Sequence, residues 1–459
     1  MNATIKLWYD EHSDETAQLA LDLWNHAEPG MEEYYSCHRT AEFMEQHGFQ
    51  TETFHILGND RKPNCVVATW GSGHPVIGIL GELDALPGLG QKAVPYRSPI
   101  EGACGHGCGH NLMNAMGSSA AVAVKEALQA ENLSGTIRYY ACPAEELGGG
   151  KMYMYQKGVF EGLDCVLSWH PQPGTNLKVK EVILNSIISA KIEFFGQDAH
   201  AAVAPETGRS ALDACELMNV GVNYLREHMD PTSRVHYVYL NGGDRPNIVP
   251  KYAALEYNIR ATDVASVTEL FERVKKCAEG AALMTETTCK ITVESVGLPP
   301  VQIDDFNRFL YRSVEKLPPL IYTEEEKAFA RELFRNHTGR NPINDEEAMP
   351  SQREAPSGVH KNVPNSTDVG WVARKVPTAR LMGLTMIGGT YMHSWACVAC
   401  TGHSIGIHGA CYVSMAIAQA AYDIFRDPSQ IPAWWEDLRQ QTASDVLPAF
   451  EQQTIDTLS

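Results

Sequence analysis

The sequence lacks a long hydrophobic run, an excess of basic residues and a regular cysteine framework. The apolar run VIGILG (76–81) ends at Glu82, far short of the roughly 20 residues that a helix needs to span a bilayer. Lysine and arginine number 37 against 56 acidic residues, and this formal charge of −19 opposes attraction to nucleic acid or an anionic membrane. We therefore expect no nucleic-acid or membrane partner, but a small molecule or another copy of the chain.

The twelve cysteines are scattered, and the start, MNATIKLWYDEHSDE, has no basic segment followed by an apolar one. Free thiols and the absence of a visible signal peptide predict a cytoplasmic location. With 459 residues, 44% of them hydrophobic and 20% charged, the chain can bury a core and is long enough for two domains.

Short apolar runs closed by glycine or proline predict buried strands of an α/β domain. Residues 14–48 and 112–130 are predicted to be helical, with Ser36 as an N-cap and Gly48 as a C-terminal stop. We expect the segment 300–365, rich in charge, proline and asparagine, to be a surface excursion. The predicted strands are NCVVATWG, PVIGILGELDALPG, GTIRYYACPAEELGGG and DCVLSWHP.

The pattern changes near residue 182, where strand-like runs such as IISAKIEFFG alternate with longer helical segments. This order predicts a two-layer α+β domain over 182–295. It would be inserted between two parts of the α/β domain, residues 1–181 and 296–459.

Residues that can bind metal recur directly after the predicted strands, where open α/β sheets place their sites. In EGACGHGCGHNLMNAMG (101–117), Cys104 and His106 are two residues apart and can point to the same side of an extended loop. A single histidine or cysteine is usually a packed or surface residue, but joint recurrence at strand ends favours a metal site. An alternative is a Cys108 nucleophile paired with His110. The full candidate set is Asp84, Cys104, His106, Glu145, Glu146, His170 and His393.

Several stretches, in order along nearly the whole chain, resemble the dinuclear zinc peptidase and aminoacylase family. That family includes carboxypeptidases, indole-acetyl-amino-acid hydrolases and aminobenzoyl-glutamate hydrolases, and the chain is most similar to the last branch. The matching stretches are WNHAEPGMEEYYS, GELDALPG, CGHGCGHN, PAEELGGGK, WHPQP, GQDAHAAVAPETGRSALDA, RPNIVP, YNIRA and GGTYMHSW.

The resemblance implies a catalytic α/β domain with an inserted dimerisation (lid) domain, and two divalent transition-metal ions, zinc in the first place, with manganese and cobalt as alternatives. Glu145 would be the general base, and Asp84 would orient a histidine ligand. His200 would stabilise the oxyanion, in the site of a partner subunit. Asn247 and Arg260 would hold the substrate. The implied metal ligands are Cys104, His106, Glu146, His170 and His393.

Many relatives carry histidine where this chain has Glu82, two residues before Asp84, and the roles of Glu82, Cys108 and His110 are left open. The resemblance implies a metal-dependent amidohydrolase that cleaves an N-acyl or aminobenzoyl amino acid, as a homodimer or with a second homologous subunit. The alternatives are a dipeptidase acting on short peptides and a degenerate, non-catalytic subunit that binds a carboxylate ligand.

Overall fold

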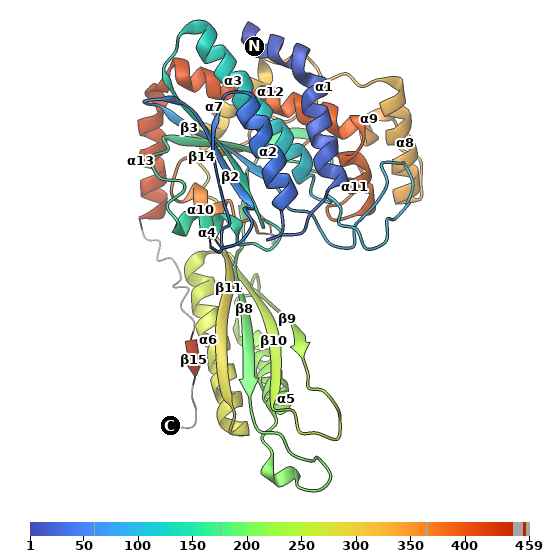
Figure 1. Cartoon of the computed structure of the whole chain (residues 1–459), viewed down its shortest axis with the longest axis vertical. Coiled ribbons are helices and arrows are strands. Elements are labelled where there is room, and N and C mark those ends of the chain that lie inside the picture. Colours follow the sequence, from blue (N-terminus) through green and yellow to red (C-terminus); the bar gives the residue numbers. More distant parts are fainter. Residues whose placement is uncertain (59, 175, 364–365, 444–452, 456–459) are drawn as a thin grey trace. The chain divides into compact units, whose positions relative to one another are not determined.

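The computed structural model describes residues 1–58, 60–174, 176–363, 366–443 and 453–455 (Figure 1). It divides the chain into two compact units. Unit 1 comprises Met1–Glu181, Val301–Lys361 and Trp371–Thr442. Unit 2 comprises Val182–Pro300, Asn362–Gly370 and Ala443–Ser459. The predicted α/β class with an inserted α+β domain is confirmed.

Unit 1 is built on a mixed sheet in the strand order β1-β2-β4-β3-β5-β14-β6-β12. Its four central strands, β4, β3, β5 and β14, are parallel, so their carboxyl ends meet at one edge of the sheet. The strands are β1 (Gln50–Phe54), β2 (Cys65–Ser72), β3 (Val76–Glu82), β4 (Gly135–Cys142), β5 (Cys165–His170), β6 (Asn176–Val179), β12 (Gln352–Arg353) and β14 (Thr378–Met382).

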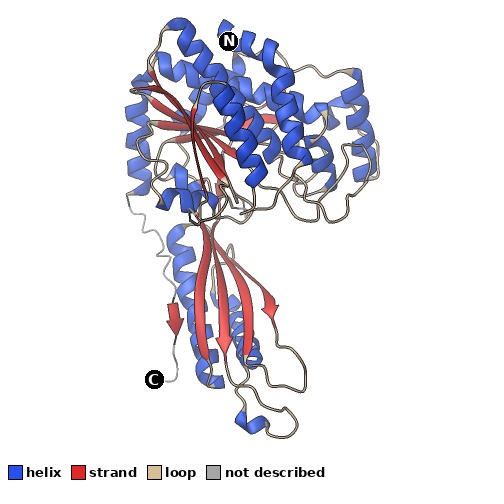
Figure 2. Cartoon of the chain, viewed as in Figure 1, coloured by secondary structure: helices blue, strands red, loops and turns tan. Residues whose placement is uncertain are grey.

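Helices pack around this sheet (Figure 2). Residues of α1, α3, α7 and α12 form its largest apolar core together with Leu167 of β5 and with Ala379 and Leu381 of β14. No described helix is long and apolar enough to cross a bilayer. The helices are α1 (Ala3–Asn25), α2 (Tyr34–Gln46), α3 (His110–Glu131), α4 (Gly150–Gln156), α7 (Asp304–Glu315), α8 (Glu324–Thr338), α9 (Asp345–Ala348), α11 (Trp395–Thr401), α12 (Ser404–Arg426), the 3₁₀ turn η3 (Pro428–Gln430) and α13 (Ile431–Thr442).

Three local predictions are wrong. The segment 14–48 is not helical throughout, because residues 26–33 separate α1 from α2. Ser36 lies inside α2, because the carboxylate of Glu28 accepts hydrogen bonds from the free backbone N–H groups of Tyr35 and Ser36 at 2.8 and 2.9 Å. The segment 300–365 is not a surface excursion. Its helices α7 and α8 are amphipathic, and they bury apolar residues in two cores: Phe306, Leu310, Phe329, Leu333 and Phe334.

Unit 2 contains a sheet in the order β15-β11-β8-β10-β9, all antiparallel, with α5 and α6 packed against its strands. A separate pair joins β7 and β13. The elements are β7 (Val182–Leu184), β8 (Ser186–Phe195), η1 (Pro205–Thr207), α5 (Ala211–Leu225), η2 (Arg226–His228), β9 (Arg234–Asn241), β10 (Tyr252–Ala261), α6 (Val264–Thr285), β11 (Thr288–Gly297) and β15 (Gln453–Ile455). Two short elements, β13 (Lys361–Val363) and α10 (Gly370–Ala373), each include residues of both units.

Candidate metal centre

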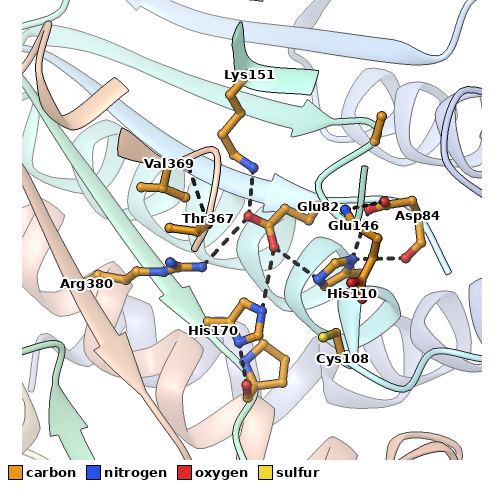
Figure 3. A network of polar contacts seen from close by, with 12 residues as sticks. Glu82, Asp84, Cys108, His110, Glu146, Lys151, His170, Thr367, Val369 and Arg380 are labelled. Carbon is orange, nitrogen blue, oxygen red and sulfur yellow. Dashed lines mark hydrogen bonds and ion pairs between the residues drawn. The ribbon is translucent and has the colours of Figure 1, made fainter. Parts of the chain in front are cut away.

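A cluster of acidic, histidine and cysteine side chains lies at the carboxyl edge of the parallel strands in unit 1 (Figure 3). Glu82 ends β3, His170 ends β5, and Glu145 and Glu146 follow β4. The loop after β4 folds back tightly, since a Cβ at Gly150 would lie 1.6 Å from the carbonyl oxygen of Pro143. The parallel sheet therefore brings together residues that are far apart in the sequence.

The first residue of α3, His110, is fixed by two neighbouring carboxylates. Its Nδ1 lies 3.0 Å from Asp84 Oδ1, and its Nε2 lies 3.2 Å from Glu82 Oε2. The other oxygen of Asp84 accepts the backbone N–H of Glu146 at 2.8 Å. Asp84 thus orients both a histidine ring and the loop that carries the two glutamates.

Glu82 lies at the centre of a buried ionic network. The Lys151 ammonium donates to Glu82 Oε1 at 2.7 Å, and Arg380 Nη2 lies 3.8 Å from the same oxygen. Glu82 Oε2 faces His110 and, at 3.8 Å, His170 Nε2. Both Glu82 and Lys151 are fully buried, so their pairing avoids the large cost of an isolated buried charge.

The second half of the cluster is formed by Cys108, Glu146 and His393. His393 Nε2 lies 3.0 Å from Cys108 Sγ and 3.3 Å from Glu146 Oε2. His393 adopts a left-handed backbone conformation, and its N–H donates to the carbonyl of Gly107 at 3.3 Å. A Cβ at Gly107 would lie only 3.2 Å from the His393 Cα, so glycine lets the two loops approach closely.

Among the described residues, three sets of ligand atoms lie close enough together to hold a metal ion. The sets are Cys108, His110 and His170; Cys108, Glu146 and His393; and Glu82, His110 and Glu145. Thiolate, imidazole and carboxylate are the donors that bind zinc and similar transition metals. Glu146 Oε1 is buried and has no hydrogen-bond partner among the described residues, as expected for an atom that binds an ion. His110 Nε2 also makes no hydrogen bond, although Glu82 Oε2 lies 3.2 Å away. The residues therefore fit a metal centre.

The electrostatics of the cluster also favour a cation. Burial alone would lower the pKa of His110, but the hydrogen bond to Asp84 and the charge of Glu82 outweigh it and raise that pKa to about 10. Burial opposes ionisation of Glu146, yet the hydrogen bond to His393 and the charge of His110 lower its pKa to about 2. The carboxylates thus stabilise positive charge at this edge of the sheet.

The alternative of a Cys108 nucleophile activated by His110 is disfavoured by the geometry. The ring of His110 is held by Asp84 and faces Glu82, and the histidine at hydrogen-bond distance from Cys108 is His393. Burial, together with Glu146 and Glu145, raises the pKa of the Cys108 thiol well above its usual value. A nucleophilic cysteine requires the opposite shift.

The structure does not place Cys104 and His106 in any of the three sets. Cys104 is partly exposed, and the Nε2 of His106 faces the carbonyl oxygen of Leu23 at 3.3 Å. Burial and the nearby His110 lower the pKa of His106 to about 3. The sequence contains the triplet Cys-Gly-His twice, at 104–106 and 108–110. The structure brings Cys108 and His110 of the second triplet, and neither Cys104 nor His106, into the donor sets.

The remaining predicted site residues belong to unit 2. His200 and Asn247 lie on adjacent segments, where the Ala201 N–H donates to the carbonyl of Asn247 at 3.0 Å and the Ala202 N–H donates to the ring of His200 at 3.2 Å. The half-buried guanidinium of Arg260 donates to Ser366 Oγ at 3.2 Å. Among the described residues, no carboxylate lies at ion-pair distance from Arg260.

Comparison with known proteins gives the family of the chain. A model of peptidase family M20/M25/M40 matches residues 78–394. The chain is 36% identical over 447 residues to one of the subunits of the p-aminobenzoyl-glutamate hydrolase of Escherichia coli (strain K12), covering 92% of each protein. It is 30% identical over 295 residues to the Xaa-Arg dipeptidase of Mus musculus, covering 62% of this chain and 64% of that protein.

Among solved structures, a dinuclear metal binding peptidase of the M20 family from Bacillus subtilis has the same fold. Its TM-score is 0.58 at 18% identity, over 91% of this chain and 99% of that one. The fold, the cluster and these matches define a metal-dependent amidohydrolase. The chain belongs to peptidase family M20/M25/M40, which confirms the resemblance found in the sequence.

Proposed function

We propose that this hydrolase cleaves the amide bond of an N-acyl amino acid of the aminobenzoyl-glutamate type. The observation that carries the proposal is the convergence of Cys108, His110, Glu146, His170 and His393 beside Glu145 at one edge of the sheet. The 36% identity to an aminobenzoyl-glutamate hydrolase subunit, over almost the full length of both proteins, supports the choice of substrate.

The donor sets fit two divalent transition-metal ions. Cys108, His110 and His170 would hold one ion, and Cys108, Glu146 and His393 the other, with Cys108 common to both sets. Sulfur and imidazole donors favour zinc over manganese, and cobalt is a possible substitute. When bound, such ions lower the pKa of a coordinated water and polarise the substrate carbonyl.

The remaining roles fall to residues of the chain. Glu145, grouped with Glu82 and His110, would accept the proton of the attacking water and pass it to the leaving nitrogen. Asp84 would keep the ring of His110 in position. In unit 2, His200 would stabilise the oxyanion and Asn247 would contact the substrate. Arg260, which lacks a carboxylate partner among the described residues, would bind a substrate carboxylate.

Metal analysis combined with a substrate panel tests this proposal. We expect about two transition-metal ions per chain, loss of activity on chelation and recovery on adding zinc. The panel would compare p-aminobenzoyl-glutamate, other N-acyl amino acids and dipeptides that end in arginine. Full activity in a rigorously metal-free sample would exclude the mechanism.

The same panel separates the two alternatives. The identity to an Xaa-Arg dipeptidase favours a dipeptidase as the second candidate, and faster cleavage of dipeptides than of p-aminobenzoyl-glutamate would establish it. A non-catalytic subunit would cleave no compound while still binding carboxylates. Because the E. coli relative is itself named as one subunit of its enzyme, a homologous second chain is a further possible partner.

We further propose that unit 2 pairs with a second copy and supplies His200 to the partner's site. β9 lies at the edge of its sheet and exposes Val238, Tyr239 and Leu240, and α5 exposes Val220 and Tyr224. An exposed edge strand with apolar side chains beside an apolar helix face is typical of a surface that pairs with another chain.

Mixing two inactive variants tests the shared site. Glu145→Gln chains and His200→Ala chains should each have little activity, but their heterodimer would contain one complete site, so the mixture should recover a fraction of wild-type activity. A mixture that stays inactive after verified subunit exchange would show that His200 does not act across the interface. Mixing either variant with itself is the control.

A further inference from the structure

A row of polar side chains crosses the sheet of unit 1 next to the metal centre. Ala379 and Leu381 of β14 point into the main apolar core, so Arg380 points to the opposite face of the sheet. On one side, the parallel register places Arg380 beside Ser168 of β5. Ser168 lies two residues before His170 on the same strand and projects from the same face. The row is therefore next to this candidate ligand.

On the other side of Arg380 lies Lys180. The antiparallel register pairs Leu381 with Val179 and Met382 with Lys178, and the next step brings Lys180 opposite Arg380. The Lys180 N–H donates to the Arg380 carbonyl at 2.8 Å. Directly opposite residues of an antiparallel pair project from the same face, so two cationic side chains share this face.

Several polar atoms of this row make no hydrogen bond. Arg380 is only 7% exposed, yet its Nε and Nη2 make no hydrogen bond within the described part of the chain, and neither does the buried hydroxyl of Ser168. The nearest carboxylate, Glu82, is 3.8 Å from Arg380 Nη2 and already accepts a hydrogen bond from Lys151 (Figure 3).

Lys180, unlike Arg380, has no ion-pair partner among the described residues. Burial, together with the charges of Arg380 and Lys178, lowers the pKa of Lys180 to about 7. The negative charge of Glu145 partly offsets this by raising that pKa. Lys180 is therefore close enough to Glu145 for the two charges to interact. By contrast, the neighbouring Lys178 lies 3.9 Å from the carboxylate of Glu354.

Two like charges directly opposite each other in a sheet destabilise it, and buried polar groups without partners add a further cost. Both costs would be removed by an anion bound between the guanidinium and the ammonium group. A carboxylate is suited to this position, because its two oxygens can accept hydrogen bonds from Arg380 and Lys180 together, with the Ser168 hydroxyl as a third donor.

We propose that Arg380, Lys180 and Ser168 form a carboxylate subsite beside the metal centre, and that it binds the side-chain carboxylate of a dicarboxylic amino acid. This inference rests on the proposed function, in which Arg260 binds the other carboxylate. The subsite would select the substrate by its second carboxylate, so that an N-acyl glutamate, with two carboxylates, is preferred over an N-acyl amino acid with one.

The test uses two substrates that differ only at this group, p-aminobenzoyl-glutamate and p-aminobenzoyl-glutamine. Wild-type enzyme should prefer the glutamate compound. In Lys180→Met, kcat/KM for the glutamate compound should fall about ten- to a hundredfold, mainly through KM, and that for the glutamine compound should change little. Lys180→Arg keeps the charge and should restore part of the preference. Lys178→Met, which removes an already paired lysine, is the matched control.

A binding measurement separates this inference from the proposed function. Titration calorimetry in a Glu145→Gln background avoids turnover, and Lys180→Met should there weaken binding of the glutamate compound by a similar factor without affecting the glutamine compound. An equal effect on both compounds, or none on either, would overturn the subsite even if the wild type hydrolyses both. If the wild type hydrolyses neither while binding still discriminates through Lys180, the proposed function is wrong and the subsite stands.

Discussion

Replacing Glu145 with glutamine should reduce turnover by at least about 100-fold, and by as much as roughly 10⁴-fold, which is the range typical of lost general acid–base catalysis. Glutamine keeps the size of the side chain but cannot accept a proton. Because Glu145 lies within 4.8 Å of ligand atoms of Glu82 and His110, it is placed beside the metal centre. KM should change little, because the substitution removes an interaction made during the chemical step.

The adjacent residue provides the matched control for this experiment. Glu146→Gln replaces a carboxylate that lies 3.3 Å from His393 Nε2 in one of the donor sets, so we expect it to lower metal content as well as activity. Glu145→Gln should retain wild-type metal content. Unchanged turnover in Glu145→Gln, or an equal loss of metal in both variants, would show that the two glutamates have been assigned the wrong roles.

The sequence predicted the α/β class because that class depends on local patterns, and the same patterns led us to expect a site at the ends of the strands. Apolar runs that end in Glu82, Cys142 and His170 are buried strands, and the polar residues that follow them converge because the strands are parallel. The change of pattern near residue 182 corresponds to the start of unit 2 at Val182. These inferences required no knowledge of contacts between distant residues.

Other features depend on contacts between residues that are distant in the sequence, which local patterns do not predict. The start of α2 is capped by Glu28, which lies in the preceding loop and accepts the backbone N–H of Ser36. Serine is a common N-cap residue, but Ser36 itself lies inside the helix. The charged segment 300–365 buries one side of α7 and α8, which the overall composition conceals. Arg380 and Lys180 become neighbours only through the pairing of β14 with β6, although a basic residue inside the apolar run TARLM was a visible signal.

The choice between the two Cys-Gly-His triplets also depends on contacts between residues that are distant in the sequence. Cys104-Gly105-His106 and Cys108-Gly109-His110 have identical spacing, so spacing alone cannot distinguish them. A usable signal was that the second triplet directly precedes the apolar helix, since His110 is the first residue of α3 and that helix packs against β3. A histidine there is carried to the carboxyl edge of the sheet, whereas His106 turns towards Leu23.

Matched substitutions in the two triplets should therefore give very different results. His110→Asn and Cys108→Ala should each lose bound metal and reduce activity by at least about 100-fold, more than the 10- to 100-fold typical of residues that only support a ligand. His106→Asn and Cys104→Ala should keep metal content and most activity, because neither side chain belongs to a donor set among the described residues. Asparagine at 106 is too short to replace the contact of Nε2 with Leu23, so we expect some loss of thermal stability without loss of metal.

Metal content measured by mass spectrometry, together with the thermal unfolding midpoint of each variant, separates loss of a ligand from loss of the fold. A ligand variant should lose metal while retaining the secondary structure of the wild type. The converse outcome, with metal lost from the Cys104 and His106 variants and retained by the other two, would assign the ligands to the first triplet. In that case His106 would bind the ion through its buried Nδ1, which makes no hydrogen bond among the described residues, while Nε2 keeps its contact with Leu23.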